Sequence, residues 1–110
     1  MTNITVYKTG NRYRGFTLEG HAGYKKICFT KDIVCASISV LAINTINSIE
    51  NFTSDVPNVE TDEKSGLIRC FFSEEPSKET TLLLDSMFLG FTEIKNEYGK
   101  KFIDIKFQEV

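Results

Sequence analysis

Alternating apolar and polar positions predict five β-strands in this chain: residues 2–8, 12–18, 57–61, 66–73 and 101–109. Alternation places the apolar side chains of a strand on one face, as in a sheet that buries one side. Thr9-Gly10-Asn11 and the residues DEKSG (62–66) are compact turn sequences between consecutive strands. The pattern therefore predicts two β-hairpins and a closing strand.

Two longer segments have apolar residues at helical spacing. From Ile33 to Phe52 most residues are apolar, and Ser37, Asn44, Ser48 and Asn51 form one narrow polar stripe. We therefore expect a largely buried helix. Asp32 can cap this helix by accepting from its free N–H groups. A second helix should start near Pro76–Ser77 and end at Gly99. Gly90 inside it costs about 1 kcal/mol relative to alanine, which indicates a close packing contact.

The order of elements is thus ββαββαβ, with the last strand after the second helix. Two helices packed on a mostly antiparallel or mixed sheet is the economical arrangement, and it predicts a two-layer α+β fold. No linker, repeat or change in composition divides the sequence. We therefore expect a single domain over residues 1–110.

Composition narrows the functional classes. A net charge of −2 and a pI near 5.4 argue against a direct nucleic-acid partner, because proteins that bind nucleic acids usually have an excess of basic residues. The N-terminus does not resemble a signal peptide, and no uninterrupted apolar run is long enough for a membrane span. Three cysteines without C-x-x-C spacing suit free thiols in a reducing compartment. We expect a cytoplasmic protein with no membrane partner.

The single histidine, His21, and Cys35 lie fourteen residues apart, on either side of a predicted loop. If Asp32 is the cap, Cys35 is the third residue of the helix, near the positive end of its dipole. A free thiol has a pKa of about 8.5, and lowering it to about 7 takes roughly 2 kcal/mol. A helix terminus supplies only about 0.3–1 kcal/mol, so a cationic neighbour must supply the rest. A nucleophile paired with its base is therefore one interpretation of Cys35 and His21.

Other interpretations of these residues stay open. Cys35 is also compatible with a small core residue, and His21 with a loop residue that has no chemical role. His21, Cys28 and Cys35 lack a fourth metal ligand at a recognisable spacing, and Lys25-Lys26 lie between them. Cys28 can instead act as a redox partner of Cys35 in a thiol sensor. We expect neither a metal ion nor a cofactor.

The motif GHAGY (residues 20–24), followed by DIVCASIS (32–39) and LAINTINSIE (41–50), resembles the Prp family, the ribosomal-processing cysteine proteases of Firmicutes and related bacteria. The likeness extends to the closing NEYGKKFIDIKFQEV. It implies a small cytoplasmic endopeptidase, usually dimeric, in which Cys35 is the nucleophile and His21 its base. Such enzymes remove a short N-terminal extension from protein twenty-seven of the large ribosomal subunit, cutting after a phenylalanine pair, and are needed for ribosome maturation.

Neighbouring residues supply candidates for substrate or oxyanion contacts: Gly20, Ala22, Asp32, Ala36 and Ser39. Backbone N–H groups around Cys35 and Ala36 are oxyanion donors if the helix begins beside them. Asp32 either caps the helix or orients His21, and Ser39 lies one turn beyond Cys35. We expect an apolar groove for the aromatic pair, with contributions from Tyr24, Phe29 and Met87.

The expected partners are the precursor of the ribosomal protein and a second copy of this chain. The alternative function is a non-catalytic protein-binding module in ribosome assembly. The two functions differ in thiol chemistry, because only a protease requires Cys35 to react and to depend on His21.

Overall fold

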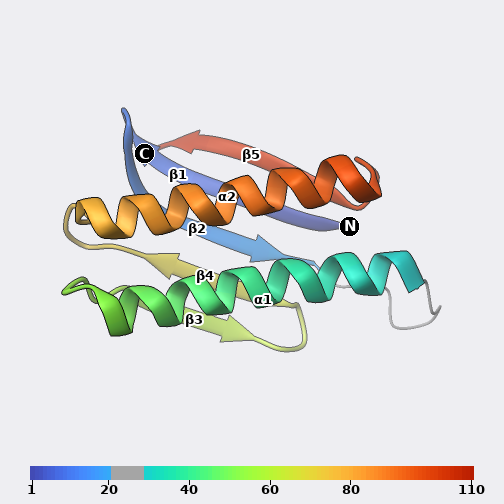
Figure 1. The fold of residues 1–110 in the computed structure, drawn as a ribbon, viewed down its shortest axis with the longest axis horizontal. Coiled ribbons are helices and arrows are strands. Elements are labelled where there is room, and N and C mark those ends of the chain that lie inside the picture. Colours follow the sequence, from blue (N-terminus) through green and yellow to red (C-terminus); the bar gives the residue numbers. More distant parts are fainter. Residues whose placement is uncertain (21–28) are drawn as a thin grey trace.

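The structure, a computed structural model, describes residues 1–20 and 29–110. Its elements follow the order β1 (Thr2–Thr9), β2 (Arg12–Glu19), α1 (Phe29–Phe52), β3 (Asn58–Asp62), β4 (Leu67–Phe71), α2 (Lys78–Tyr98) and β5 (Ile103–Glu109). The predicted order ββαββαβ and the α+β class are confirmed (Figure 1). Each observed strand overlaps its predicted segment, and no end differs by more than two residues.

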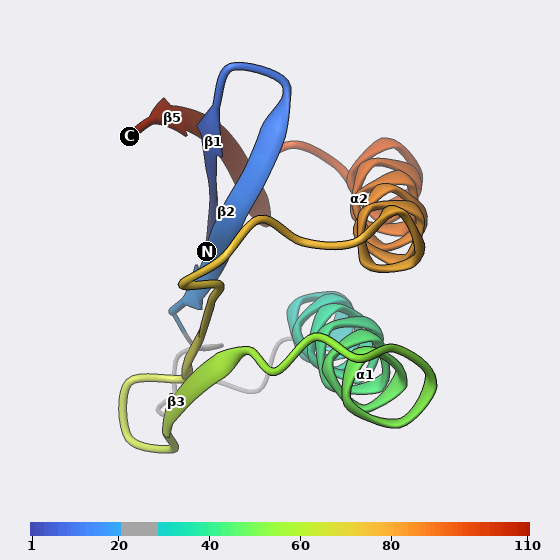
Figure 2. The ribbon, with the colours of Figure 1, turned by 90° about the vertical axis from the view of Figure 1, so that its left-hand side faces the viewer.

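The strands form one mixed sheet in the order β3-β4-β2-β1-β5. Of the neighbouring strands in the described residues, β1 and β5 pair in parallel and the others are antiparallel. Helix α1 joins β2 to β3, and α2 joins β4 to β5; each helix therefore connects two parallel strands that are not neighbours. Since β2 and β4 run in opposite directions and their connections move toward opposite edges, right-handed crossovers place both helices on the same face. Figure 2 shows this two-layer arrangement.

The core lies between the sheet and the two helices. It combines the inward-facing residues of the strands with one stripe from each helix, including Ile4, Val6, Phe16, Leu18, Ile68, Cys70, Ile38, Ile49, Leu84, Met87 and Phe91. Between the helices, a Cβ added to Gly90 would lie 2.8 Å from Cδ1 of Leu41, so the close contact predicted at Gly90 is confirmed. Helix α2 begins after Ser77, whose hydroxyl accepts from the N–H of Thr80, and ends at Gly99.

Helix α1 differs from its prediction at its start and in its burial. It begins at Phe29 rather than Ile33, so Asp32 is its fourth residue and not its N-cap. Val40 and Ile43 are 66% and 50% exposed, which shows that the helix is less buried than its composition suggests. The segment Ile33–Phe52 is long and apolar enough to span a membrane by length and composition alone. In this fold its buried stripe packs on the sheet and on α2, as expected for a core helix.

At the other end of α1, one carboxylate joins the two helices. Asp55 Oδ2 accepts from the N–H of Ser77 at 2.9 Å, from its hydroxyl at 2.7 Å, and from the buried hydroxyl of Thr80. Burial raises the pKa of this carboxyl, but the hydrogen bonds outweigh burial and hold the pKa of Asp55 below its ordinary value. The ionised form of Asp55 thus fixes the N-terminus of α2.

Candidate active site

The backbone is closely constrained where the chain leaves β2, at Gly20. Gly20 has φ +104°, which L residues rarely adopt, and an added Cβ would lie 2.4 Å from the carbonyl oxygen of Met1. Its N–H donates to the carbonyl oxygen of Ser65 at 3.2 Å, which joins the end of β2 to the β3–β4 turn. His21 therefore directly follows a residue whose backbone position is fixed by these contacts. His21 and Ala22 themselves lie outside the described residues.

Cys35 is half-buried on α1, between core residues. Val34 and Ile38 beside it are almost fully buried. Cys35, Ser39 and Ile43 follow one another at intervals of four and so form one stripe along the border of the buried face. Figure 1 shows the N-terminal half of α1, the end of β2 and the β3–β4 turn at the same end of the molecule. The fold thus places the candidate nucleophile at the end where β2 leads into His21.

The observed start of α1 changes the electrostatic argument for Cys35. The free N–H groups of a helix end with its third residue, because the N–H of the fourth already donates to the carbonyl that precedes the helix, so in α1 the helical ladder begins at the N–H of Asp32. The N–H groups of Cys35, the seventh residue, and of Ala36 belong to the helical ladder. The expectation that they are free at the helix start was therefore wrong. Because the effect of the dipole falls off within the first turn, Cys35 depends more on a nearby cation than the sequence suggested.

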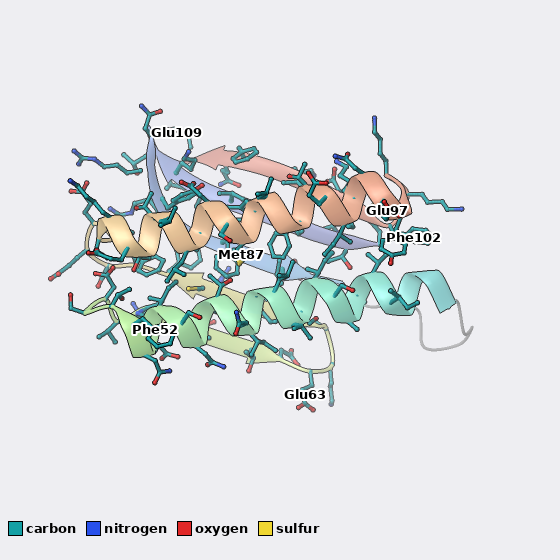
Figure 3. All side chains as sticks on the ribbon, viewed as in Figure 1. Phe52, Glu63, Met87, Glu97, Phe102 and Glu109 are labelled. Atoms are coloured by element: carbon teal, nitrogen blue, oxygen red, sulfur yellow. The ribbon has the colours of Figure 1, made fainter. Side chains whose placement is uncertain are left out.

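A groove lies beside this stripe, between α1 and the β3–β4 hairpin, and we call it the hairpin groove. Its volume is about 310 Å³, and its lining is Ser39, Ile43, Thr61, Asp62, Glu63, Gly66, Leu67 and Ile68. Ser39 was a candidate from the sequence and lines this groove one turn from Cys35. The hairpin residues were not found from the sequence, because neither a motif nor spacing relates them to Cys35. Figure 3 shows Glu63 at the tip of the hairpin.

Some residues expected near the site lie elsewhere. Ala36 is exposed and lines a separate groove of about 550 Å³ between α1 and α2, together with Val40 and Tyr98. Met87 is 2% exposed and belongs to the core, as Figure 3 shows, so the expectation that it lines a substrate groove was wrong. Tyr24 lies outside the described residues.

The cysteines fall into different environments. Cys70 is fully buried on β4, where burial first and the charge of Glu50 second raise the pKa of its thiol to about 12. Cys70 is therefore a core residue, whereas Cys35 is accessible in part. Cys28 lies outside the described residues, so the structure does not test the redox and metal interpretations that include it. Within the part of the chain that the structure describes, no three His, Cys, Asp or Glu side chains are placed to hold a metal ion.

A sequence profile of the family described as cysteine protease Prp matches residues 1–103. The ribosomal processing cysteine protease Prp of Staphylococcus aureus is 28% identical over 98 residues, which cover 89% of this chain and 90% of that protein. The match therefore includes both Gly20-His21-Ala22 and Cys35 with their surroundings.

Two crystal structures of an essential ribosomal processing protease Prp from S. aureus have the same fold as this chain. The complex with a substrate peptide has a TM-score of 0.87 at 22% identity, and covers 98% of this chain and 100% of that chain. The complex with a covalently linked product peptide has a TM-score of 0.85 at 23% identity, with the same coverage.

Proposed function

The chain belongs to the Prp family of cysteine proteases, and we propose that it processes a ribosomal protein with Cys35 as nucleophile and His21 as base. Its substrate is the precursor of protein twenty-seven of the large ribosomal subunit. The enzyme removes the short N-terminal extension and cuts after the aromatic pair. Support comes from the relative in S. aureus, which is a ribosomal processing protease and has been crystallised with substrate and product peptides.

One observation carries this assignment: Cys35 is half-buried on α1 at the end of the molecule where Gly20 fixes the start of the segment that follows β2. A nucleophile needs access to substrate, and Cys35 has it whereas the buried Cys70 does not. His21 is the single imidazole of the sequence and directly follows Gly20. No other residue of this chain can serve as a histidine base.

The reaction proceeds by acyl transfer. His21 accepts the proton of the Cys35 thiol, and Sγ attacks the carbonyl carbon of the second residue of the aromatic pair. The tetrahedral intermediate collapses as His21 donates the proton to the leaving amine, which leaves a thioester on Cys35. Water, deprotonated by His21, then hydrolyses the thioester and releases the extension.

The enzyme acts in the cytoplasm, in line with an odd number of cysteines, and as a homodimer. The dimer is supported by apolar side chains that α2 exposes on one face, because Leu82 and Leu89 are separated by two turns and are 69% and 63% exposed. Sedimentation at micromolar concentration tests this part of the proposal. A purely monomeric protein would remove the dimer and leave the protease assignment intact.

Peptide cleavage tests the central proposal. A synthetic peptide that carries the extension, with Phe-Phe before the cleavage site, is incubated with wild type, Cys35→Ala and His21→Ala, and the products are identified by mass spectrometry. We expect cleavage after the aromatic pair by wild type alone. Cleavage by Cys35→Ala would refute the assigned nucleophile. An intact peptide and an intact full-length precursor, both bound by wild type, would favour a non-catalytic binding module.

A further inference from the structure

The hairpin groove begins one helical turn from the nucleophile. Ser39 and Ile43 lie four and eight residues after Cys35, hence about 6 and 12 Å along the axis of α1. An extended peptide rises about 3.3 Å per residue. A chain whose scissile bond lies at Cys35 and which runs along α1 therefore reaches the groove roughly two to four residues from that bond.

A free sheet edge lies beside this groove. Among the described residues, strand β3 is the last strand on its side of the sheet, pairs with β4 alone, and exposes all five of its residues. Alternate residues of an edge strand leave their N–H and C=O groups without partners in the sheet. An extended peptide can pair with those groups and add a strand to the sheet. Thr61 and Asp62 belong both to β3 and to the groove, so one peptide can use the two features together.

The groove has an apolar part and an acidic rim. Ile43, Leu67 and Ile68 provide the apolar surface, and Asp62 and Glu63 lie at the hairpin end. Asp62 accepts the backbone N–H of Lys64 at 3.0 Å, and within the described residues it forms no ion pair. The groove is therefore complementary to an apolar side chain that has a lysine or arginine close by.

We infer that the hairpin groove and the free edge of β3 bind the substrate. The peptide adds to β3 as an extended strand, an apolar side chain two to four residues from the scissile bond enters the groove, and a basic side chain faces Asp62. Precursors of ribosomal proteins fit this chemistry, because proteins that bind RNA carry many lysines and arginines. This inference rests on the proposed protease function and adds the residues that select the substrate.

The first test couples the groove to one position of the peptide. Each apolar residue on either side of the scissile bond is replaced by alanine in turn, and kcat/KM is measured with wild type, Ile43→Ser and Val40→Ser. Val40 is a matched control, since it is an exposed apolar residue of the same helix that lines the other groove. One alanine replacement, at a position two to four residues from the scissile bond, should lower kcat/KM about tenfold with wild type and with Val40→Ser.

With Ile43→Ser, kcat/KM for the parent peptide should already be about tenfold lower than with wild type, and the same alanine replacement in the peptide should lower kcat/KM little further. If Ile43→Ser cleaves every peptide as wild type does, the groove does not bind substrate although the protease function stands. If wild type cleaves neither peptide nor precursor, the proposed function fails and the inference fails with it.

The second test addresses charge and strand pairing. Asp62→Asn keeps the oxygen that accepts from Lys64 but removes the charge, and Asp104→Asn on β5 is the control at the opposite edge. We expect Asp62→Asn alone to reduce the preference for a lysine-containing peptide over its glutamine analogue, by about threefold to fivefold. Peptide bound to Cys35→Ala should slow hydrogen exchange at amides of β3. Unchanged exchange there would overturn strand addition, and an unchanged preference would overturn the role of Asp62.

Discussion

Replacing Gly20 by alanine is expected to destabilise the protein and to lower its proteolytic activity. Gly99 offers a matched control, because the two glycines have nearly the same φ, +104° and +106°. Around Gly99 no heavy atom of the described residues, apart from Gly99 and its two chain neighbours, lies within 4 Å of an added Cβ, whereas at Gly20 the Cβ would lie 2.4 Å from the carbonyl oxygen of Met1. The pair of variants therefore separates backbone strain from a steric clash.

The expected magnitudes follow from this difference. Alanine at such a φ costs about 1–3 kcal/mol in either position. At Gly20 the clash involves two backbone segments, so one of them must move. The hydrogen bonds at risk are Gly20 N–H to the carbonyl oxygen of Ser65 and Thr2 N–H to that of Phe102. At about 0.5–1.5 kcal/mol each, their loss adds about 1–3 kcal/mol to the cost of Gly20→Ala.

Urea unfolding of wild type, Gly20→Ala and Gly99→Ala measures the stabilities, and kcat/KM of the folded fraction measures the activity. Gly20→Ala should lose about 1–3 kcal/mol more than Gly99→Ala. It should also lose at least tenfold in kcat/KM, since His21 follows the displaced residue, while Gly99→Ala stays within about twofold of wild type. Equal stabilities of the two variants would refute the contact with Met1. A fully active Gly20→Ala would refute the role of Gly20 in placing His21.

Two further predictions concern residues outside the catalytic pair. Asp55→Asn should lower the free energy of unfolding by about 1–3 kcal/mol at pH 7, because it removes the charge that accepts hydrogen bonds at the start of α2. Since folding lowers the pKa of Asp55, its contribution is complete above the unfolded-state pKa of about 4 and is lost as the pH falls through the folded-state pKa. Urea unfolding at several pH values measures this contribution of Asp55 to stability. As a control, replacing an exposed carboxylate by Glu93→Gln should change the free energy of unfolding by less than about 0.5 kcal/mol. An equal loss in both variants would contradict the role of Asp55. Iodoacetamide at pH 8 should alkylate Cys35 in the native protein but Cys70 only after unfolding, because burial raises the pKa of Cys70 to about 12. Mass spectrometry follows the labelling of the two cysteines. Similar labelling rates for both in the native protein would contradict the burial of Cys70 on β4.

Local patterns in the sequence were sufficient for the elements of this fold. Alternation identified all five strands because side chains of a strand face opposite sides in turn. Ser77 and Gly99 marked the limits of α2 through capping and backbone preferences, which depend on few neighbouring residues. Gly90 indicated a close packing contact, since a glycine inside a helix is costly without a packing reason, and the structure shows that the partner is Leu41. The motifs around His21 and Cys35 identified the family.

Tertiary structure decided what depends on residues far apart in the chain. The parallel pairing of β5 with β1, the position of β3 at an edge and the groove between Ile43 and Leu67 follow from how two crossovers and two hairpins share one sheet. The sequence also placed the start of α1 too late, because apolar periodicity begins only at the part of the helix that packs on the core. Local propensity sets the periodicity of an element, whereas its partners and its exposed edges result from the packing free energy summed over the whole fold.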